Sequence, residues 1–174
     1  MLIMILGGAA SGKSEFAESL CMRLSEKKLY IATMEPYGDE ALMHIKRHTD
    51  MRKTKGFDTL EKYTRLYECE ITGYDTILLE CMSTLLANEF FTDENYYENI
   101  FTGIDKLKNS CSNLVVITNQ VFSDGESYGE ETERYRKALG RINCTLASLA
   151  DAVIEVVYGI PVMIKGEDLK NELI

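Results

Sequence analysis

GGAASGKS, residues 7–14, fits the pattern G-x-x-x-x-G-K-[ST] of a phosphate-binding loop. The apolar run LIMIL at residues 2–6 precedes it and predicts a buried strand. Residues 15–24 follow it with apolar side chains at helical spacing, which predicts a helix. Strand, glycine-rich loop and helix in this order form the context that the pattern requires. We therefore expect the phosphates of a nucleotide to bind to Gly7, Gly8, Ala9, Ala10, Ser11, Gly12, Lys13 and Ser14.

The chemistry of such a loop follows from its residue types. Glycines let the backbone turn so that successive N–H groups point into one hollow, and the start of the next helix adds a partial positive charge. Lys13 would reach the outer phosphates of a nucleoside triphosphate, and the Ser14 hydroxyl would bind Mg²⁺, which prefers oxygen ligands. The alternative is a glycine turn that leads into a helix without a ligand, and the strand and helix on either side disfavour it.

The composition is that of one globular domain, residues 1–174, with 45% hydrophobic and 27% charged residues. No apolar run approaches the ~20 residues of a membrane span, and the N-terminus lacks the basic region and cleavage site of a signal peptide. We therefore expect a cytoplasmic protein. The formal net charge of −9 argues against a nucleic acid partner, although a local cationic pocket could still bind a small anionic substrate.

The cysteines are scattered along the chain without a C-x-x-C pair: Cys21, Cys69, Cys81, Cys111 and Cys144. In a cytosolic protein this pattern predicts reduced and mostly buried thiols. A metal site or a catalytic cysteine is the alternative, and the lack of a metal-ligand spacing disfavours it.

Short apolar runs alternate with longer amphipathic stretches along the rest of the chain. Further strands are expected at residues 28–33, 57–60, 75–79, 113–118, 152–157 and 162–165. Further helices are expected at residues 39–52, 81–91, 96–108 and 131–149, and a short polar tail begins at residue 166. This alternation predicts a single-domain, P-loop NTPase-like α/β fold: a mostly parallel sheet with helices on both faces, and a last strand that can run antiparallel.

Ligands of such folds bind at the carboxyl ends of the strands, so residues that directly follow a strand are candidate site residues. Besides the glycine-rich loop, these are residues 33–35, Glu80, and the pair Asn119 and Gln120. Glu80 ends an apolar strand, and an acid at this point helps to hold Mg²⁺ in nucleotide-binding α/β folds. The alternative is an ordinary acidic residue at a strand end.

The two histidines, His44 and His48, lie four residues apart on the helix expected at residues 39–52, so they share one face. A metal pair is one interpretation, but no nearby cysteine or third histidine supports it. Both could instead be exposed helix residues. A third interpretation makes one of them a nucleophile, because an imidazole nitrogen can attack an α-phosphorus, expel pyrophosphate and form a nucleotidyl-histidine. The neighbouring Arg47 and Arg52 could then neutralise phosphate charge.

Six segments in this order resemble the bifunctional adenosylcobinamide kinase / adenosylcobinamide-phosphate guanylyltransferase family: GGAASGKSEFAE, YIATMEP, DEALMHIKRHTDMR, ILLECMSTLLAN, VVITNQV and RYRKALGRINCTLASLADAVIEVVYGIPVMIKG. The resemblance covers nearly the whole chain. Its most specific parts are YIAT, the helix D-E-x₄-I-x-x-H and the tail LGRIN…LA…ADAV…V-x-G-I-P. These parts separate the chain from the many other P-loop kinases.

The resemblance implies two late steps in the assembly of the nucleotide loop of cobalamin. A nucleoside triphosphate, ATP or GTP, first phosphorylates the aminopropanol hydroxyl of adenosylcobinamide. GTP then transfers GMP to that phosphate through a guanylylated histidine, which gives adenosyl-GDP-cobinamide and pyrophosphate. The family also implies a homotrimer, with nucleotide bound near the subunit contacts.

The resemblance assigns site residues position by position. His48 matches the histidine at the end of D-E-x₄-I-x-x-H and is the expected guanylyl acceptor, whereas His44 receives no role. Some relatives carry two adjacent histidines where this chain has Arg47 and His48. Lys13 is the second expected catalytic residue. Further nucleotide contacts are expected at YIAT, near the guanine nucleotide and at the strand-end acid: Ala32, Thr33, Thr49, Arg52, Glu61 and Glu80.

The chain departs from the family where the usual stretch T-N-E-V-G reads TNQVF, residues 118–122, so that the amide of Gln120 replaces a carboxylate. An amide cannot take a proton at neutral pH, so the kinase step would weaken if the family's glutamate serves as a base or metal ligand. The usually apolar loop that follows is polar at residues 123–128, and it could help to accept the corrinoid. Two alternatives stay open: a small-molecule P-loop kinase without transferase activity, and a nucleotide-dependent binding protein or ATPase.

Overall fold

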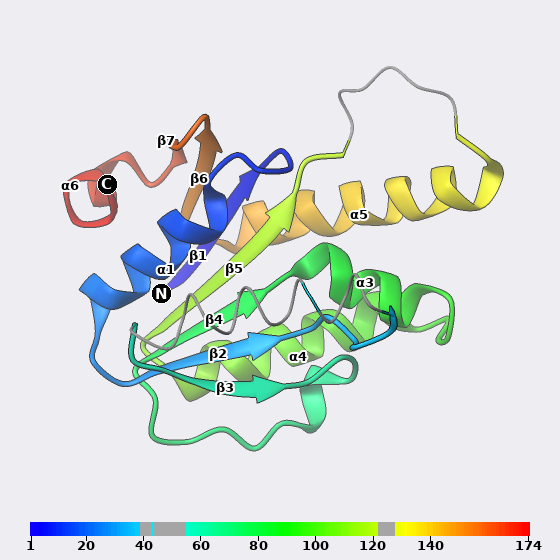
Figure 1. Cartoon of the computed structure of the whole chain (residues 1–174), viewed down its shortest axis with the longest axis horizontal. Helices are drawn as coiled ribbons and strands as arrows, with labels where there is room; N and C mark the ends of the chain where they lie inside the picture. The colour runs from blue at the N-terminus through cyan, green and yellow to red at the C-terminus, as the bar shows by residue number, and fades with distance from the viewer. Residues whose placement is uncertain (39–42, 44–54, 122–127) are drawn as a thin grey trace.

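The computed structural model describes residues 1–38, 43, 55–121 and 128–174 (Figure 1). The helix expected at residues 39–52 and most of the polar loop after residue 121 fall outside this part. Within it, seven strands form one sheet in the order β3-β2-β4-β5-β1-β6-β7. Their bounds are Leu2–Gly7 (β1), Lys28–Ala32 (β2), Phe57–Glu61 (β3), Thr76–Glu80 (β4), Asn113–Asn119 (β5), Ala152–Val157 (β6) and Ile160–Lys165 (β7).

The sheet is parallel from β1 to β6, and β7 pairs antiparallel with β6, as the sequence predicts. One face carries α1 (Lys13–Leu24) and the short C-terminal α6 (Lys170–Leu173). The other face carries α3 (Met82–Phe90), α4 (Tyr96–Ser110) and α5 (Glu130–Leu149) (Figure 1). In the part of the chain that is described, no helix is both long and apolar enough to span a membrane.

The alternation of side chains in β1 shows why the strands read as continuous apolar runs. Leu2 and Met4 pack into the core on the side of α3, α4 and α5, whereas Ile3 and Ile5 pack into the core on the side of α1. All four are buried, because a strand in the middle of a parallel sheet has helices over both of its faces. The predicted α/β fold with helices on both faces is therefore confirmed.

The C-terminal tail differs from the expectation of a short polar segment. After Gly166 the chain forms a 3₁₀ turn, η2 (Glu167–Leu169), and then α6. Leu173 is fully buried in the core beside α1, and Arg23 Nη2 donates a hydrogen bond of 2.8 Å to the Leu173 carbonyl oxygen. Two leucines in nine residues are too few to give a periodic pattern, although one of them anchors the tail. A second 3₁₀ turn, η1 (Leu66–Glu68), is also missing from the expected elements.

Candidate active site

The sheet brings most of the predicted site residues to one edge. Gly7, Ala32, Glu61 and Glu80 each end a strand, and parallel strands place their carboxyl ends together. The strand register pairs Ala32 with both Glu61 and Glu80, and it pairs Gly7 with Asn119. Residues that lie up to 112 positions apart in the chain (Gly7 and Asn119) are therefore direct neighbours at the mouth of the glycine-rich loop.

The glycine-rich loop needs its glycines for geometric reasons. Gly12 has φ of 90°, a left-handed backbone that non-glycine residues rarely adopt, and it caps the N-terminus of α1. A Cβ atom on Gly7 would lie only 2.7 Å from the Val156 carbonyl oxygen, so a larger residue would push the loop away from β6. Lys13 folds back over the loop, where its Nζ donates a 3.0 Å hydrogen bond to the Gly8 carbonyl oxygen. Burial lowers the pKa of this lysine, against the opposing effect of nearby Cys81 and Glu80.

A hydroxyl and a carboxylate meet just beyond the loop. Ser14, in the first turn of α1, donates a 2.9 Å hydrogen bond from its Oγ to Glu80 Oε1 at the end of β4. Burial raises the pKa of Glu80 to about 7; the Ser14 hydrogen bond and Lys13 act in the opposite direction, while Glu18 adds to the increase. The Glu80 carboxyl group therefore changes its protonation near neutral pH, and a cation beside it would favour its charged form.

The residues at this point fit Mg²⁺. Ser14 Oγ and the Glu80 carboxylate are hard oxygen donors from two different elements, which is what Mg²⁺ prefers. Over the described ranges, no group of three or more His, Cys, Asp and Glu side chains gathers to form an all-protein metal cage. An ion held here would thus complete its shell with water and with phosphate oxygens, as Mg²⁺ commonly does in nucleotide sites.

Thr33 has a structural role that the sequence does not reveal. It is fully buried. Thr33 Oγ1 donates a 3.0 Å hydrogen bond to the Glu80 carbonyl oxygen and accepts a 2.8 Å hydrogen bond from the Cys81 N–H. Asn88 of α3 donates from its Nδ2 to the Thr33 carbonyl oxygen at 2.8 Å. These bonds fix the backbone that carries Glu80. A direct contact between Thr33 and a nucleotide stays a prediction.

A second set of polar groups lies where β5 ends. Asn119 Nδ2 donates a 2.6 Å hydrogen bond to Ser83 Oγ in α3, and the Tyr135 hydroxyl of α5 donates to the Ser83 carbonyl oxygen at 2.8 Å. The Gln120 N–H donates to the Gly7 carbonyl oxygen at 3.2 Å and joins this strand end to the glycine-rich loop. Sequence reasoning names Asn119 and Gln120 as candidates because they follow a strand, but it misses Ser83 and Tyr135, which no motif marks.

The turn between β6 and β7 lies against the other side of the loop. The Gly159 N–H donates a 2.8 Å hydrogen bond to the Ser11 carbonyl oxygen. A Cβ atom built on Gly12 would lie 3.1 Å from Gly159 Cα, so the two backbones are in close contact. Ser11 Oγ is buried and has no hydrogen-bond partner in the described part of the chain. The sequence predicts the turn but not this contact, which depends on the order of strands in the sheet.

Glu61 lies apart from the pair formed by Ser14 and Glu80. Glu61 is exposed at the end of β3 and accepts a 2.8 Å hydrogen bond from the Tyr63 hydroxyl; it lies two strands from Glu80, about 10 Å away at ordinary strand spacing. His48, Thr49 and Arg52 fall outside the described residues, so their places in the site stay predictions.

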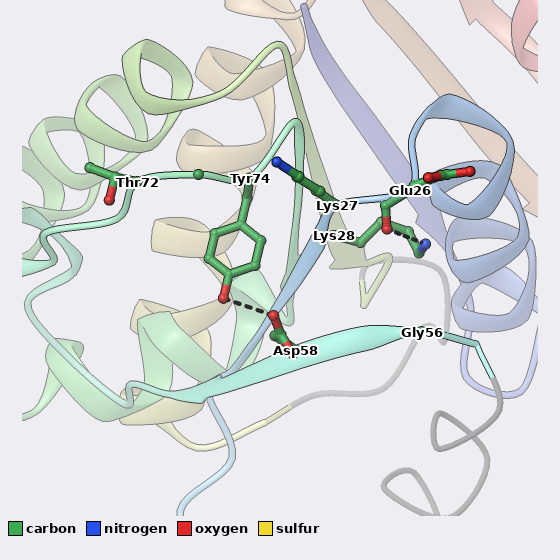
Figure 2. Close-up of a pocket in the computed structure, with 8 residues that line it drawn as sticks. Glu26, Lys27, Lys28, Gly56, Asp58, Thr72 and Tyr74 are labelled. Atoms are coloured by element: carbon green, nitrogen blue, oxygen red, sulfur yellow. Dashed lines mark hydrogen bonds between the residues drawn. The ribbon is translucent and has the colours of Figure 1, made fainter.

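A separate pocket opens at the opposite edge of the sheet, near the amino ends of β2 and β3 (Figure 2). Figure 2 shows the Tyr74 hydroxyl on Asp58, a hydrogen bond of 3.0 Å, and the Lys28 ammonium on the Glu26 carbonyl oxygen at 2.9 Å. The described residues that line this pocket are Glu26, Lys27, Lys28, Gly56, Asp58, Thr72, Gly73 and Tyr74, and no predicted site residue is among them.

Comparison with known proteins connects this geometry to a family. The family model for cobinamide kinase / cobinamide phosphate guanyltransferase matches residues 3–164. The chain is 33% identical over 183 residues to the bifunctional adenosylcobalamin biosynthesis protein CobU of Escherichia coli K12, with 95% of this chain and 100% of that protein covered. It is 27% identical over 174 residues to the bifunctional adenosylcobalamin biosynthesis protein CobP of Pseudomonas aeruginosa, with 95% and 98% covered.

Among solved structures, the flagellar accessory protein FlaH from Methanocaldococcus jannaschii is similar in fold, with a TM-score of 0.58 at 15% identity. The alignment covers 94% of this chain and 77% of FlaH, and at this identity the likeness concerns the fold alone. The family match, by contrast, spans the glycine-rich loop, the strand-end acid and the β6–β7 turn, and relatives align over their full length. This chain belongs to the cobinamide kinase / cobinamide phosphate guanyltransferase family.

Proposed function

We propose that this chain phosphorylates the aminopropanol hydroxyl of adenosylcobinamide and then transfers GMP from GTP to the new phosphate. Both reactions would take place in one domain, in the cytoplasm, where nucleoside triphosphates are available. The observation that carries the proposal is the contact between Ser14 and Glu80 beside Lys13, in a chain that belongs to the family.

In the kinase step, the substrate hydroxyl oxygen attacks the γ-phosphorus of ATP or GTP. A new P–O bond forms, the bond to the β-phosphate oxygen breaks, and a nucleoside diphosphate and a proton are released. Lys13 would bind the β- and γ-phosphates, and the N–H groups of the glycine-rich loop would hold them in place. Ser14 and Glu80 would hold Mg²⁺, which supplies neutralisation of phosphate charge when bound. The protein contributes positioning and electrostatics rather than covalent chemistry.

In the transferase step, an imidazole nitrogen of His48 attacks the α-phosphorus of GTP. A P–N bond forms and pyrophosphate leaves, which gives a guanylyl-histidine. The phosphate of adenosylcobinamide phosphate then attacks the same phosphorus and releases the histidine. Support for His48 comes from the D-E-x₄-I-x-x-H motif and from the family, since the residue lies outside the described ranges. Thr49, Arg52 and Glu61 are proposed to contact the guanine nucleotide.

We also propose that the chain forms a homotrimer. The outward face of β7 supports a contact between copies, because alternate residues of this edge strand expose large apolar side chains to solvent: Ile160, Val162 and Ile164. An exposed apolar edge strand is a common site of association. Sedimentation equilibrium would give the number of subunits.

The transferase step can be tested with α-³²P-GTP and Mg²⁺ in the absence of corrinoid, followed by denaturing electrophoresis. We expect an acid-labile label that persists in His44→Ala and disappears in His48→Ala. The His44 variant is the matched control, since it removes the other histidine from the same sequence segment. A wild-type protein that binds GTP but takes up no label would refute the guanylyl-histidine and leave a plain kinase.

The kinase step is measured separately, by transfer of γ-³²P from ATP or GTP to adenosylcobinamide. We expect Lys13→Ala to abolish this transfer, and His48→Ala to retain it. Nucleotide hydrolysis in the absence of corrinoid, with no transfer when corrinoid is present, would instead favour the ATPase alternative.

A further inference from the structure

Asn119 ends β5 in the middle of the carboxyl edge of the sheet. In the strand order β4-β5-β1, it lies between Glu80, which ends β4, and Gly7, where the glycine-rich loop begins (Figure 1). Gly7 is its partner in the strand register, whereas the pairing of β4 with β5 ends at Leu79 and Val116. Because Glu80 follows Leu79 directly, Asn119 lies two residues beyond the level of Glu80, about 7 Å further along the strand direction.

The proposed position of the γ-phosphate is next to Asn119. Lys13 is proposed to bind the β- and γ-phosphates, and Ser14 and Glu80 to hold Mg²⁺, so the γ-phosphate belongs above the gap between β1 and β4 that β5 fills. Cys81 connects Asn119 to this group, because its Sγ accepts a 3.6 Å hydrogen bond from Asn119 Nδ2 and it lies near Lys13. An attacking oxygen approaches in line with the bond to the β-phosphate, from the open side of the γ-phosphate. Asn119, which extends beyond Glu80, borders this side.

The surrounding hydrogen bonds fix the side-chain amide of Asn119 and leave one of its atoms open. Besides the contact with Cys81, Nδ2 donates a 2.6 Å hydrogen bond to Ser83 Oγ, and the Tyr135 hydroxyl holds the Ser83 carbonyl oxygen at 2.8 Å. Asn143 of α5 donates from its Nδ2 to the Asn119 carbonyl oxygen at 3.3 Å. Over the described part of the chain, no hydrogen bond reaches Asn119 Oδ1. The residue is half-buried, so this oxygen is open to a ligand.

We propose that Asn119 Oδ1 accepts a hydrogen bond from the hydroxyl of the kinase acceptor and thereby aims the hydroxyl oxygen at the γ-phosphorus. This inference rests on the proposed function, because it requires an alcohol acceptor and a nucleoside triphosphate in the loop. An amide oxygen only accepts hydrogen bonds, so it suits a hydroxyl and not the phosphate acceptor of the transferase step, which carries no proton at pH 8. Asn119 therefore acts in the kinase step alone.

Asn119 holds the hydroxyl without taking its proton. As the hydroxyl oxygen forms a bond to the γ-phosphorus, the bond to the β-phosphate oxygen breaks, the nucleoside diphosphate leaves and the hydroxyl proton passes to water. An amide is not a base at neutral pH, and phosphoryl transfer depends mainly on positioning, so an oriented hydroxyl is sufficient. Ser83 and Tyr135 are positioning residues, since they act on the acceptor only through Asn119.

Asn119→Ala tests the proposal when both half-reactions are measured on the same protein at pH 8. We expect kcat/KM for the transfer of γ-³²P to adenosylcobinamide to fall by about ten- to a hundredfold, because the acceptor loses its orientation. The calorimetric Kd for GTP with Mg²⁺ and the rate of guanylyl-histidine formation from α-³²P-GTP should stay unchanged, which also shows that the variant is folded. Ser83→Ala should lower the same kcat/KM by about three- to tenfold and leave the other two quantities unchanged.

Asn113→Ala is the matched control, because it removes the same side chain from the opposite end of β5, where Asn113 Nδ2 donates to Thr76 Oγ1 at 3.4 Å. We expect it to leave both half-reactions unchanged. Wild-type phosphorylation by Asn119→Ala, an equal loss of GTP affinity or of guanylyl-histidine formation, or an equal loss of phosphorylation in Asn113→Ala would each overturn the proposal. Failure of the proposed function has a different signature: a wild type that binds GTP but phosphorylates no adenosylcobinamide would refute the kinase step, and this inference with it.

Discussion

Replacing Glu80 by Gln should make the nucleotide-free protein more stable at neutral pH. Burial raises the pKa of the Glu80 carboxyl group from an ordinary value of 4.5 to about 7. Converted to free energy, the charged carboxylate costs the folded protein about 3 kcal/mol at pH 8. A glutamine cannot become charged, and its amide oxygen can still accept the hydrogen bond that Ser14 donates at 2.9 Å.

The sign of the pH dependence follows from the two pKa values. Between pH 4.5 and 7, the folded protein keeps a proton on Glu80 that the unfolded chain has released. The unfolded state binds fewer protons in this window, so the free energy of unfolding decreases as pH rises and becomes level above pH 7. The stability that the folded protein gains by keeping this proton on Glu80 is fully present below pH 4.5. Glu80→Gln lacks it, so its advantage should grow from near zero at pH 4.5 to as much as about 3 kcal/mol at pH 8.

Urea unfolding followed by circular dichroism, at intervals from pH 4.5 to 8 in EDTA and without nucleotide, measures this difference. Glu94→Gln is the matched control, because it removes a carboxyl group from the exposed turn between α3 and α4. The pH dependence that Glu80→Gln shows beyond that of Glu94→Gln measures the contribution of the buried Glu80 carboxyl group. A difference for Glu80→Gln that depends on pH no more than the difference for Glu94→Gln, or a wild type that is the more stable protein at pH 8, would refute the reasoning.

Three further substitutions test the packing that positions the site, each by urea unfolding. Gly12→Ala should lower the free energy of unfolding by about 1–2 kcal/mol and abolish GTP binding, because Gly12 has φ of 90° and the new Cβ would lie 3.1 Å from Gly159 Cα. An unchanged GTP affinity in calorimetry would contradict this expectation. Gly103→Ala should lower the free energy of unfolding by about 1–3 kcal/mol, although alanine has the better helix propensity, because the new Cβ would lie 2.6 Å from Leu66 Cβ. A variant more stable than the wild type would show that η1 moves aside to make room for the methyl group. Leu173→Ala should lower the free energy of unfolding by about 2–4 kcal/mol, because the Leu173 side chain is fully buried and anchors the tail. A loss below about 0.5 kcal/mol would show that α6 does not anchor the tail.

The sequence was sufficient for the fold and for the centre of the site because those features rest on local patterns. The run at residues 2–6, the glycine-rich loop and the following helix are contiguous, and all three form as expected. Glu80 was identifiable because it ends an apolar strand, and the structure indeed places it on Ser14. The positions of the seven strands and of α1, α3, α4 and α5 were predictable to within a few residues for the same reason, since these elements repeat their apolar residues at a fixed spacing.

The contacts that tune the site could not be read from the sequence, because they join distant segments. Ser83 looks like an ordinary polar residue, and Thr33 was predicted only as a nucleotide contact. The order of the strands is what brings Ser83 to Asn119 and Thr33 to the backbone of Glu80. The raised pKa of Glu80 depends on burial by residues from several elements. The contact of the β6–β7 turn with the loop depends on β6 lying next to β1, which no local pattern specifies.

The disfavoured charge of Glu80 predicts a trade between stability and binding. Glu80 is a carboxyl group held where its charged form is disfavoured by burial. A cation bound together with the nucleotide would relieve this cost. Glu80→Gln should therefore stabilise the nucleotide-free protein and weaken nucleotide binding, a trade that is common at functional sites.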